Sequence, residues 1–231
     1  MTMTYIELCQ RAAMECDISG AGPVTVTGNV GELKRICTWV AQAWTDIETA
    51  HEDWGWMLKD ASFATVAGQA EYTPAECGIV EATLGWALGV WVRNRFRNYV
   101  TANGVISEVI MDSDCTYDGW RNNYSYGATR STRTRPLVVA IHPNQQNLLL
   151  GPYPDAGYTI TGQYYRAPVP LVADADVPDI PTQFQMAIVY KAMMYYGAYE
   201  SAPEVFSRGE QEFGKMMARM DASRLPDVSF G

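Results

Sequence analysis

Residues 29–51 read NVGELKRICTWVAQAWTDIETAH and carry the strongest helical signal in the chain. Apolar side chains recur there every three or four positions, the spacing of one helix face; they are Leu33, Ile36, Cys37, Val40, Trp44 and Ile47. The polar side chains fall mainly on the other side and are Lys34, Arg35, Gln42, Asp46 and Glu48. Asn29 followed by Glu32 has the form of a capping box. The stretch predicts an amphipathic helix of about five turns.

Helical patterns also occupy both ends of the chain. An apolar stripe from Tyr5 to Cys16 predicts a first helix, which Thr2 or Thr4 can cap. Two further helices are predicted after Pro181, with a corner at 201–203, and Gly209 would let them approach closely. We therefore expect residues 1–56 and 181–223 to form one helical bundle.

The middle of the chain, residues 57–172, carries strand and turn signals instead. Residues 136–142, 147–151 and 158–166 are short runs rich in β-branched residues, Leu and Tyr, separated by turn-like segments. Short connections favour an antiparallel meander, because parallel pairing needs a longer crossover. Arg93, Arg95 and Arg97 alternate and would share one strand face. The sequence predicts an α+β fold, a helical bundle with an inserted antiparallel β module.

Charge and cysteine usage restrict the function. The net charge of −9 and a pI near 4.7 argue against tight nucleic-acid binding, which uses clustered Lys and Arg. The five cysteines are odd in number and lack zinc or C-x-x-C spacing, so we expect buried, reduced thiols and assembly in a reducing cytoplasm. We expect neither a signal peptide nor a membrane segment, since the longest apolar run is far below about 20 residues.

Catalytic signals are sparse. The two histidines, His51 and His142, have no metal-ligand partner at helical spacing, and His51 falls at the end of a helix, where it would offset the dipole. The phosphate-loop, dinucleotide and nucleophile-elbow motifs are missing from the sequence. Asp174 to Asp179 reads as a solvated linker. We expect no enzyme activity, with no catalytic, cofactor-binding or metal-binding residues.

One segment is locally basic. Residues 121–135 carry four arginines and two interleaved tyrosines with no acidic side chain, which allows either phosphate contact or contact with an acidic neighbouring subunit. In an acidic protein we favour the subunit contact. The irregular tail 224–231 is interpreted as a C-terminal arm that binds a partner. The expected contact residues are Arg121, Arg130, Arg133, Arg135, Arg224, Leu225 and Phe230.

The order of several short motifs resembles a known family. These motifs are DWGW at 53–56, EYTP at 71–74, LLLGPYPD at 148–155, YYRAPVPL at 164–171 and PDIP at 178–181. Together they resemble bacteriophage head-to-tail adaptor (connector) proteins of the tubular tail protein A type. The resemblance implies a structural virion protein of the neck, assembled in the bacterial host cytoplasm. It implies a ring, a dodecamer, that binds the portal protein and a tail or nozzle protein, while DNA passes through without specific binding.

Two other readings stay open. The aromatic-rich middle allows a carbohydrate-binding or depolymerase module of a tail fibre, although such a module would have a longer β array and no flanking bundle. Another neck component, a stopper or tail-completion protein, would differ only in the ring that it contacts.

Overall fold

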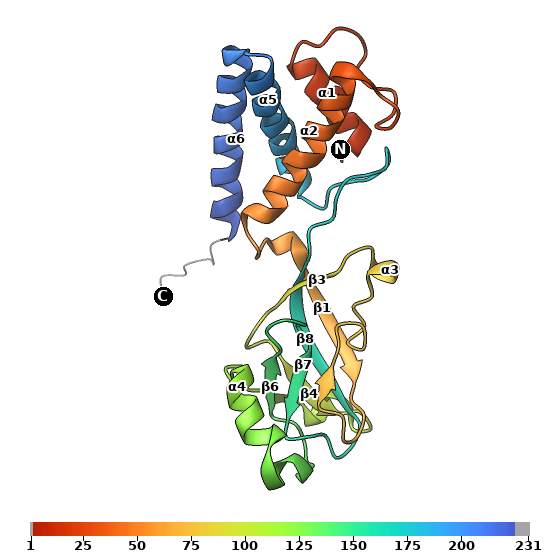
Figure 1. Cartoon of the computed structure of the whole chain (residues 1–231), viewed down its shortest axis with the longest axis vertical. Helices are drawn as coiled ribbons and strands as arrows, with labels where there is room; N and C mark the ends of the chain where they lie inside the picture. Colours follow the sequence, from red (N-terminus) through yellow and green to blue (C-terminus); the bar gives the residue numbers. More distant parts are fainter. Residues whose placement is uncertain (1, 225–231) are drawn as a thin grey trace. The chain divides into compact units, whose positions relative to one another are not determined.

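The structure is a computed structural model that describes residues 2–224, with side chains as far as Ser223. The chain folds as two compact units (Figure 1). The described parts of 1–56 and 168–231 form a helical unit, and residues 57–167 form a β module. The predicted α+β class is confirmed: helices from both chain ends form a bundle, and the antiparallel module is inserted between them.

Four long helices build the helical unit: α1 (Tyr5–Glu15), α2 (Gly31–Ala50), α5 (Met186–Tyr199) and α6 (Pro203–Arg224). The short 3-10 turns η1 (Gly55–Met57) and η5 (Thr182–Phe184) precede β1 and α5. Helix α5 packs against α1, α2 and α6, and α1 also packs against α2. The apolar stripes predicted from the sequence are buried at these contacts, as for Leu8, Val40 and Trp44. Among the described residues, no helix combines the length and apolar character needed to cross a membrane.

The starts of α1 and α2 differ. At α1 the cap is Thr4, one of the two predicted residues, and its hydroxyl forms a capping box with the Glu7 carboxylate that was not predicted. At α2 the predicted box is wrong, because the helix begins at Gly31 and Val30 is its N-cap without a side-chain bond. Gly31 has φ +60°, a turn that leaves Asn29 outside the helix. The Asn29 amide instead donates to the Thr25 carbonyl at 2.5 Å.

Two acidic predictions in the helical unit are also corrected. Glu48, expected on the solvent side of α2, is buried and accepts a hydrogen bond from the Val169 amide at 3.0 Å. The expected solvated linker is packed against the N-terminus of α1, where the Asp176 carbonyl accepts the Tyr5 amide at 2.7 Å. The Asp174 carboxylate accepts the Val26 amide at 2.6 Å. Residues 168–180 are thus hydrogen-bonded to segments far away in the sequence, which local composition does not reveal.

Eight strands form two antiparallel sheets in the β module. The larger sheet has the order β1-β8-β4-β5, with β3 also paired to β8, and the smaller has the order β2-β7-β6. The strands are β1 (Leu58–Ala64), β2 (Glu71–Tyr72), β3 (Leu88–Trp91), β4 (Arg97–Val100), β5 (Val109–Ile110), β6 (Val138–Ile141), β7 (Leu148–Gly151) and β8 (Tyr158–Arg166). The short helical pieces are α3 (Glu81–Leu84), η2 (Gly104–Ser107), α4 (Tyr117–Trp120), η3 (Arg121–Ser125) and η4 (Gly127–Ser131).

The two sheets pack around one apolar cluster. Side chains of β1 and β8, including Phe63 and Ile160, meet Leu148 and Leu150 of β7 in this cluster. The other face of β7 is covered too, because Leu149 packs with Trp120 of α4. The Trp120 indole donates to the Leu150 carbonyl at 3.0 Å and fixes α4 on the smaller sheet. Strand β7 is therefore buried on both faces.

Two strand predictions are corrected. The expected meander of 136–142, 147–151 and 158–166 holds only for the β6–β7 pair, because β8 leaves for the other sheet and pairs with β1 along all seven β1 residues. A long alternating strand finds a partner of matching length far away in sequence, and local spacing does not show this. Arg93, Arg95 and Arg97 do not share a strand face, since residues 92–96 lie in the connection between β3 and β4.

Candidate interaction site

The basic segment 121–135 does not form one uniform surface. Arg121, at the junction of α4 and η3, lies over two aromatic rings, 5.6 Å from the Tyr117 centroid and 5.3 Å from that of Tyr126. It also donates a hydrogen bond to the Tyr126 hydroxyl. These contacts hold the guanidinium against the module and leave its charge partly accessible.

Arg130 and Arg133 are the exposed members of the segment. Arg130 is in η4, and Arg133 makes an isolated bridge with Tyr153. The Arg133 guanidinium lies so close to Gly68 that a Cβ there would be 2.8 Å from Nη1. Both arginines can still present positive charge to a partner.

Arg135 is used inside the module. Its guanidinium donates to Asn98 Oδ1 at 2.6 Å, to the Asn98 carbonyl at 2.8 Å and to the Ser107 carbonyl. Asn98 is buried, and its amide donates to the Pro136 carbonyl at 2.6 Å. Arg135 therefore joins β4 to the β4–β5 connection, a positioning role that composition alone could not separate from the neighbouring arginines.

The predicted contacts in the C-terminal arm cannot be placed. Leu225 and Phe230 lie outside the described residues, and Arg224 ends α6 without a described side chain.

A second surface, missed by the sequence reading, is an apolar tip between β4 and β5. Ile106 is 97% exposed, Val105 is 67% exposed and Ile110 on β5 is 70% exposed. The sequence does carry a signal for this tip: Val105 and Ile106 are apolar, whereas turn segments are normally polar. The Ser107 hydroxyl donates to the Gly104 carbonyl at 3.0 Å and accepts the Val100 amide at 2.9 Å, so the tip is tightly held.

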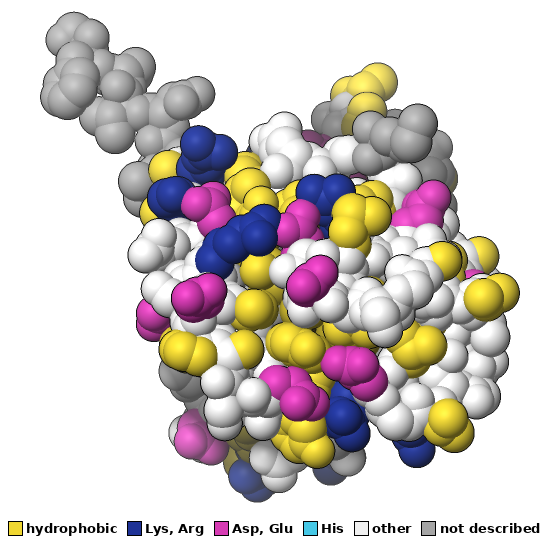
Figure 2. All heavy atoms as spheres, turned by 90° about the horizontal axis from the view of Figure 1, so that it is seen from above, with side chains coloured by type: hydrophobic (Ala, Val, Ile, Leu, Met, Phe, Trp, Pro, Cys, Tyr) yellow, Lys and Arg dark blue, Asp and Glu magenta, His cyan; other side chains and the backbone are white. Residues whose placement is uncertain are grey.

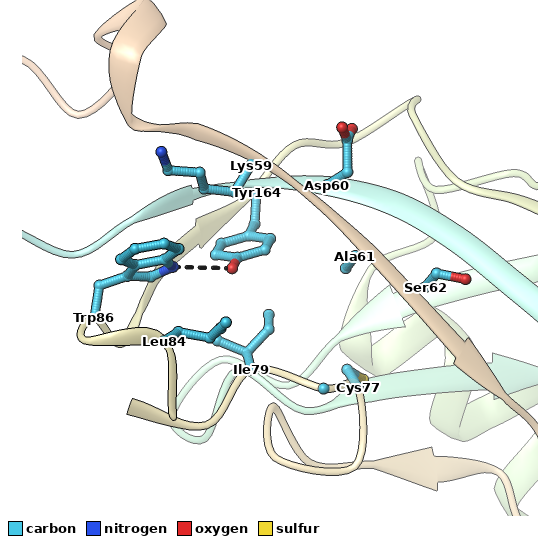
Figure 3. Close-up of a pocket in the computed structure, with 10 residues that line it drawn as sticks. Lys59, Asp60, Ala61, Ser62, Cys77, Ile79, Leu84, Trp86 and Tyr164 are labelled. Atoms are coloured by element: carbon cyan, nitrogen blue, oxygen red, sulfur yellow. Dashed lines mark hydrogen bonds between the residues drawn. The ribbon is translucent and has the colours of Figure 1, made fainter. Parts of the chain in front are cut away.

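A pocket of about 310 Å³ lies beside strand β1 (Figure 3). Residues 59–62 form one side, and Ile79, Leu84, Trp86 and Tyr164 supply apolar walls. The Trp86 indole donates to the Tyr164 hydroxyl at 3.2 Å, and this bond fixes both rings. Lys59 Nζ lies 5.0 Å from the centroid of the Trp86 ring. The pocket is therefore a rigid apolar hollow with a cation at its edge.

The chemistry of this pocket is weak. Cys77 also lines it, but burial raises the pKa of its thiol to about 12, so the thiol stays protonated at neutral pH. A protonated thiol is a poor nucleophile. The hollow is suited to receiving a side chain.

A second hollow of about 400 Å³ lies under α4, between Tyr117, Trp120, Tyr153 and His142. His142 is engaged in its own turn, because its Nδ1 accepts the amides of Asn144 and Gln145, both at 3.3 Å. His51 in the helical unit has its Nε2 3.1 Å from the Asp221 carboxylate and makes an edge contact with the Trp54 ring. Within the described part of the chain, no three His, Cys, Asp or Glu side chains are grouped to hold a metal ion.

Surface charges are mixed in sign. On the face shown in Figure 2, acidic and basic side chains lie among hydrophobic ones and neither sign forms a continuous band. Several are paired in the helical unit, such as Arg11 with Glu15 at 2.7 Å and Arg35 with Glu200 at 3.4 Å. On this face the surface is therefore mixed rather than uniformly acidic.

Comparison with known proteins assigns the family. The family model described as SU10 adaptor protein matches residues 3–229. The chain belongs to the SU10 adaptor protein family, whose members are phage adaptor proteins with a structural role in the virion. No curated protein matches the chain. The predicted relationship to phage head-to-tail adaptors is confirmed by the family match over both units.

Proposed function

We propose that this adaptor forms a ring that joins the capsid portal to the tail and continues the DNA channel. The observation that carries the proposal is the family match over residues 3–229, which includes both the helical unit and the β module. The proposed ring is a dodecamer in the neck of the virion, with the portal protein on one side and a tail or nozzle protein on the other. It acts without catalysis and needs no cofactor.

The physical properties of the chain support this role. A closed ring of identical subunits needs two different complementary faces on each subunit. The excess of acidic side chains, with a net charge of −9, disfavours specific DNA binding and would let DNA pass. The buried thiols suit assembly in the host cytoplasm, since burial raises the pKa of Cys16 and of Cys77 to about 12 and keeps both unreactive.

The proposal also assigns a role to each part of the chain. We assign 1–56 with 181–223 as the bundle, to which 168–180 is bonded, 57–167 as the module and 224–231 as a partner-binding arm. Arg121, Arg130 and Arg133 are the proposed charged contacts of the module, and Arg224, Leu225 and Phe230 those of the arm. Arg135, although grouped with them by sequence, is assigned a positioning role because its donors are used internally.

The experiment is reconstitution. The purified chain is mixed with the portal of its own phage and imaged by cryo-electron microscopy, and a closed ring on the portal is expected. Arg130→Ala with Arg133→Ala should weaken attachment, whereas Lys34→Ala with Arg219→Ala removes two exposed charges from the helical unit and serves as the charge-matched control. Binding to isolated tails but not to portal would replace the proposal by a tail-completion role, and no binding to either would overturn it.

A further inference from the structure

We propose that the apolar tip at Ile106 of one copy inserts into the pocket beside β1 of the next copy. The contact would be a knob-into-pocket interface between β modules. The pairwise contact needs only two copies of this chain. The inference rests on the proposed function only where the contact is repeated to close a ring.

The tip is an exposed apolar group held in a fixed shape. Ile106 is 97% exposed and next to Val105, in a turn that has its own internal hydrogen bonds. Arg135 donates to the Ser107 carbonyl and ties the turn to β4. A rigid apolar side chain loses little conformational freedom on binding, and such residues are typical anchors of interfaces.

The pocket has the size and chemistry to receive it. The hollow measures about 310 Å³, which is ample for a four-carbon side chain. In Figure 3 the labelled Leu84, Ile79, Trp86 and Tyr164 surround the hollow. Filling it with Ile106 would remove apolar surface of both partners from water.

Sheet order makes the contact intermolecular and head-to-tail. The pocket is beside β1 at one edge of the larger sheet, and the tip adjoins β5 at the opposite edge. The two also lie near different ends of β8, since Val100 pairs with Tyr158 and Lys59 pairs with Tyr164. Six residues of strand span roughly 20 Å at about 3.3 Å each. A tip therefore cannot reach its own pocket, and repeating the contact uses two different faces, as a ring requires.

Charges beside the two elements are complementary. Glu108 follows the tip by two residues and forms an exposed ion pair with Arg97 at 3.1 Å, and both Lys59 and Asp60 line the pocket. Exposed pairs contribute little to stability, so Glu108 can exchange partners at low cost. The tip and the pocket each carry one side chain of either sign, so docking can pair Glu108 with Lys59 and Arg97 with Asp60.

Cross-linking tests the pairwise contact. Ile106→Cys and Leu84→Cys are made separately in a background with Cys77→Ala and Cys115→Ser, mixed, and oxidised with diamide, which converts the two thiols to a disulfide. We expect several-fold more covalent heterodimer than from a control mixture of Val66→Cys with Leu84→Cys, since Val66 is 60% exposed but outside the pocket. Equal yields from the two mixtures, with circular dichroism showing all variants folded, would overturn the inference.

Assembly tests its role in the ring. Ile106→Glu and Leu84→Glu should each abolish ring formation on the portal, and Val66→Glu should not. A mixture of Ile106→Glu with Leu84→Glu retains one intact tip and one intact pocket, so it should stop at a heterodimer. Wild-type rings together with Ile106→Glu rings would sink the inference and leave the proposed function standing. A cross-linked heterodimer without wild-type rings would support the contact and reject the ring.

Discussion

The helical unit and the β module are stabilised in different ways. In the helical unit, apolar stripes of α1, α2 and α5 meet, and the buried polar or charged residues are few, Glu48 and Gln185 among the described residues. In the module, the same criterion gives five: Thr65, Asn98, Ser113, Asn147 and Arg166. Buried indoles donate in both units, as where Trp91 Nε1 donates to the Gln146 carbonyl and Trp44 Nε1 to the Val169 carbonyl, each at 2.8 Å. The helical unit relies on apolar burial, and the module relies in addition on particular hydrogen-bond partners.

This difference changes what each unit tolerates. An apolar core accepts changes of similar volume at modest cost. A buried polar group that loses its partner keeps its full desolvation penalty, so its environment is less tolerant. Mutations of the two kinds, placed in the two units, are therefore the direct way to challenge the comparison.

The largest effect is expected from Trp44→Ala on α2. Trp44 is 1% exposed, and its indole donates to the Val169 carbonyl at 2.8 Å. Removing a buried tryptophan costs about 3–5 kcal/mol in stability. Chemical denaturation followed by far-ultraviolet circular dichroism measures the loss. Trp39→Ala, on the same helix but only half-buried, is the control and should cost less. Equal losses of stability at the two positions would show that side-chain burial does not determine the stability of the helical unit.

The next effect is expected from Arg135→Met in the module. The change keeps an apolar stem but removes the donors to Asn98 and Ser107, so buried acceptors lose their partners. We expect a loss of about 2–3 kcal/mol. Arg130→Met, at an exposed position, should stay within about 0.5 kcal/mol of the parent. The same denaturation measurement decides, and a loss at Arg135 no larger than at Arg130 would contradict the dependence of the module on specific donors.

The two units also differ in how far sequence predicts them. Helices α2 and α6 follow from periodicity because a helix places its neighbours three or four residues apart. The partner of β8 does not follow, since its pairing with β1 spans residues 58–64 and 159–165 and leaves no local trace. The sequence also could not separate the arginines of the candidate site. Arg130 is exposed and Arg135 is bonded inside the module, yet both lie in the same locally basic segment. Ile106 was overlooked because an apolar residue in a turn is informative only once its exposure is known.

A smaller effect concerns the α5–α6 contact that the sequence did predict. A Cβ on Gly209 would lie 2.9 Å from the Tyr190 carbonyl oxygen, so Gly209→Ala forces the helices apart. We expect a loss of about 1–3 kcal/mol from overpacking. Gly214→Ala is the matched control on α6, where no atom lies within 4 Å of the new Cβ. It should instead stabilise the helix by about 0.5–1 kcal/mol. Thermal unfolding curves that move in the same direction would refute the close approach at Gly209.

The smallest effect comes from tyrosine ionisation in the helical unit, and it changes stability only at alkaline pH. Burial, together with a hydrogen bond to Asp46, raises the pKa of Tyr195 from 10.0 to about 12. Below pH 10 the phenol is neutral in both states, so stability there is independent of this group. Between pH 10 and about 12 the unfolded chain loses the proton while the folded chain keeps it, and stability falls as pH rises. Tyr195→Phe should reduce that slope in denaturation midpoints measured against pH.

Tyr158→Phe in the module, where burial also raises the tyrosine pKa but less strongly, should change the slope less. The opposite order would mean that the module's tyrosine carries the alkaline sensitivity.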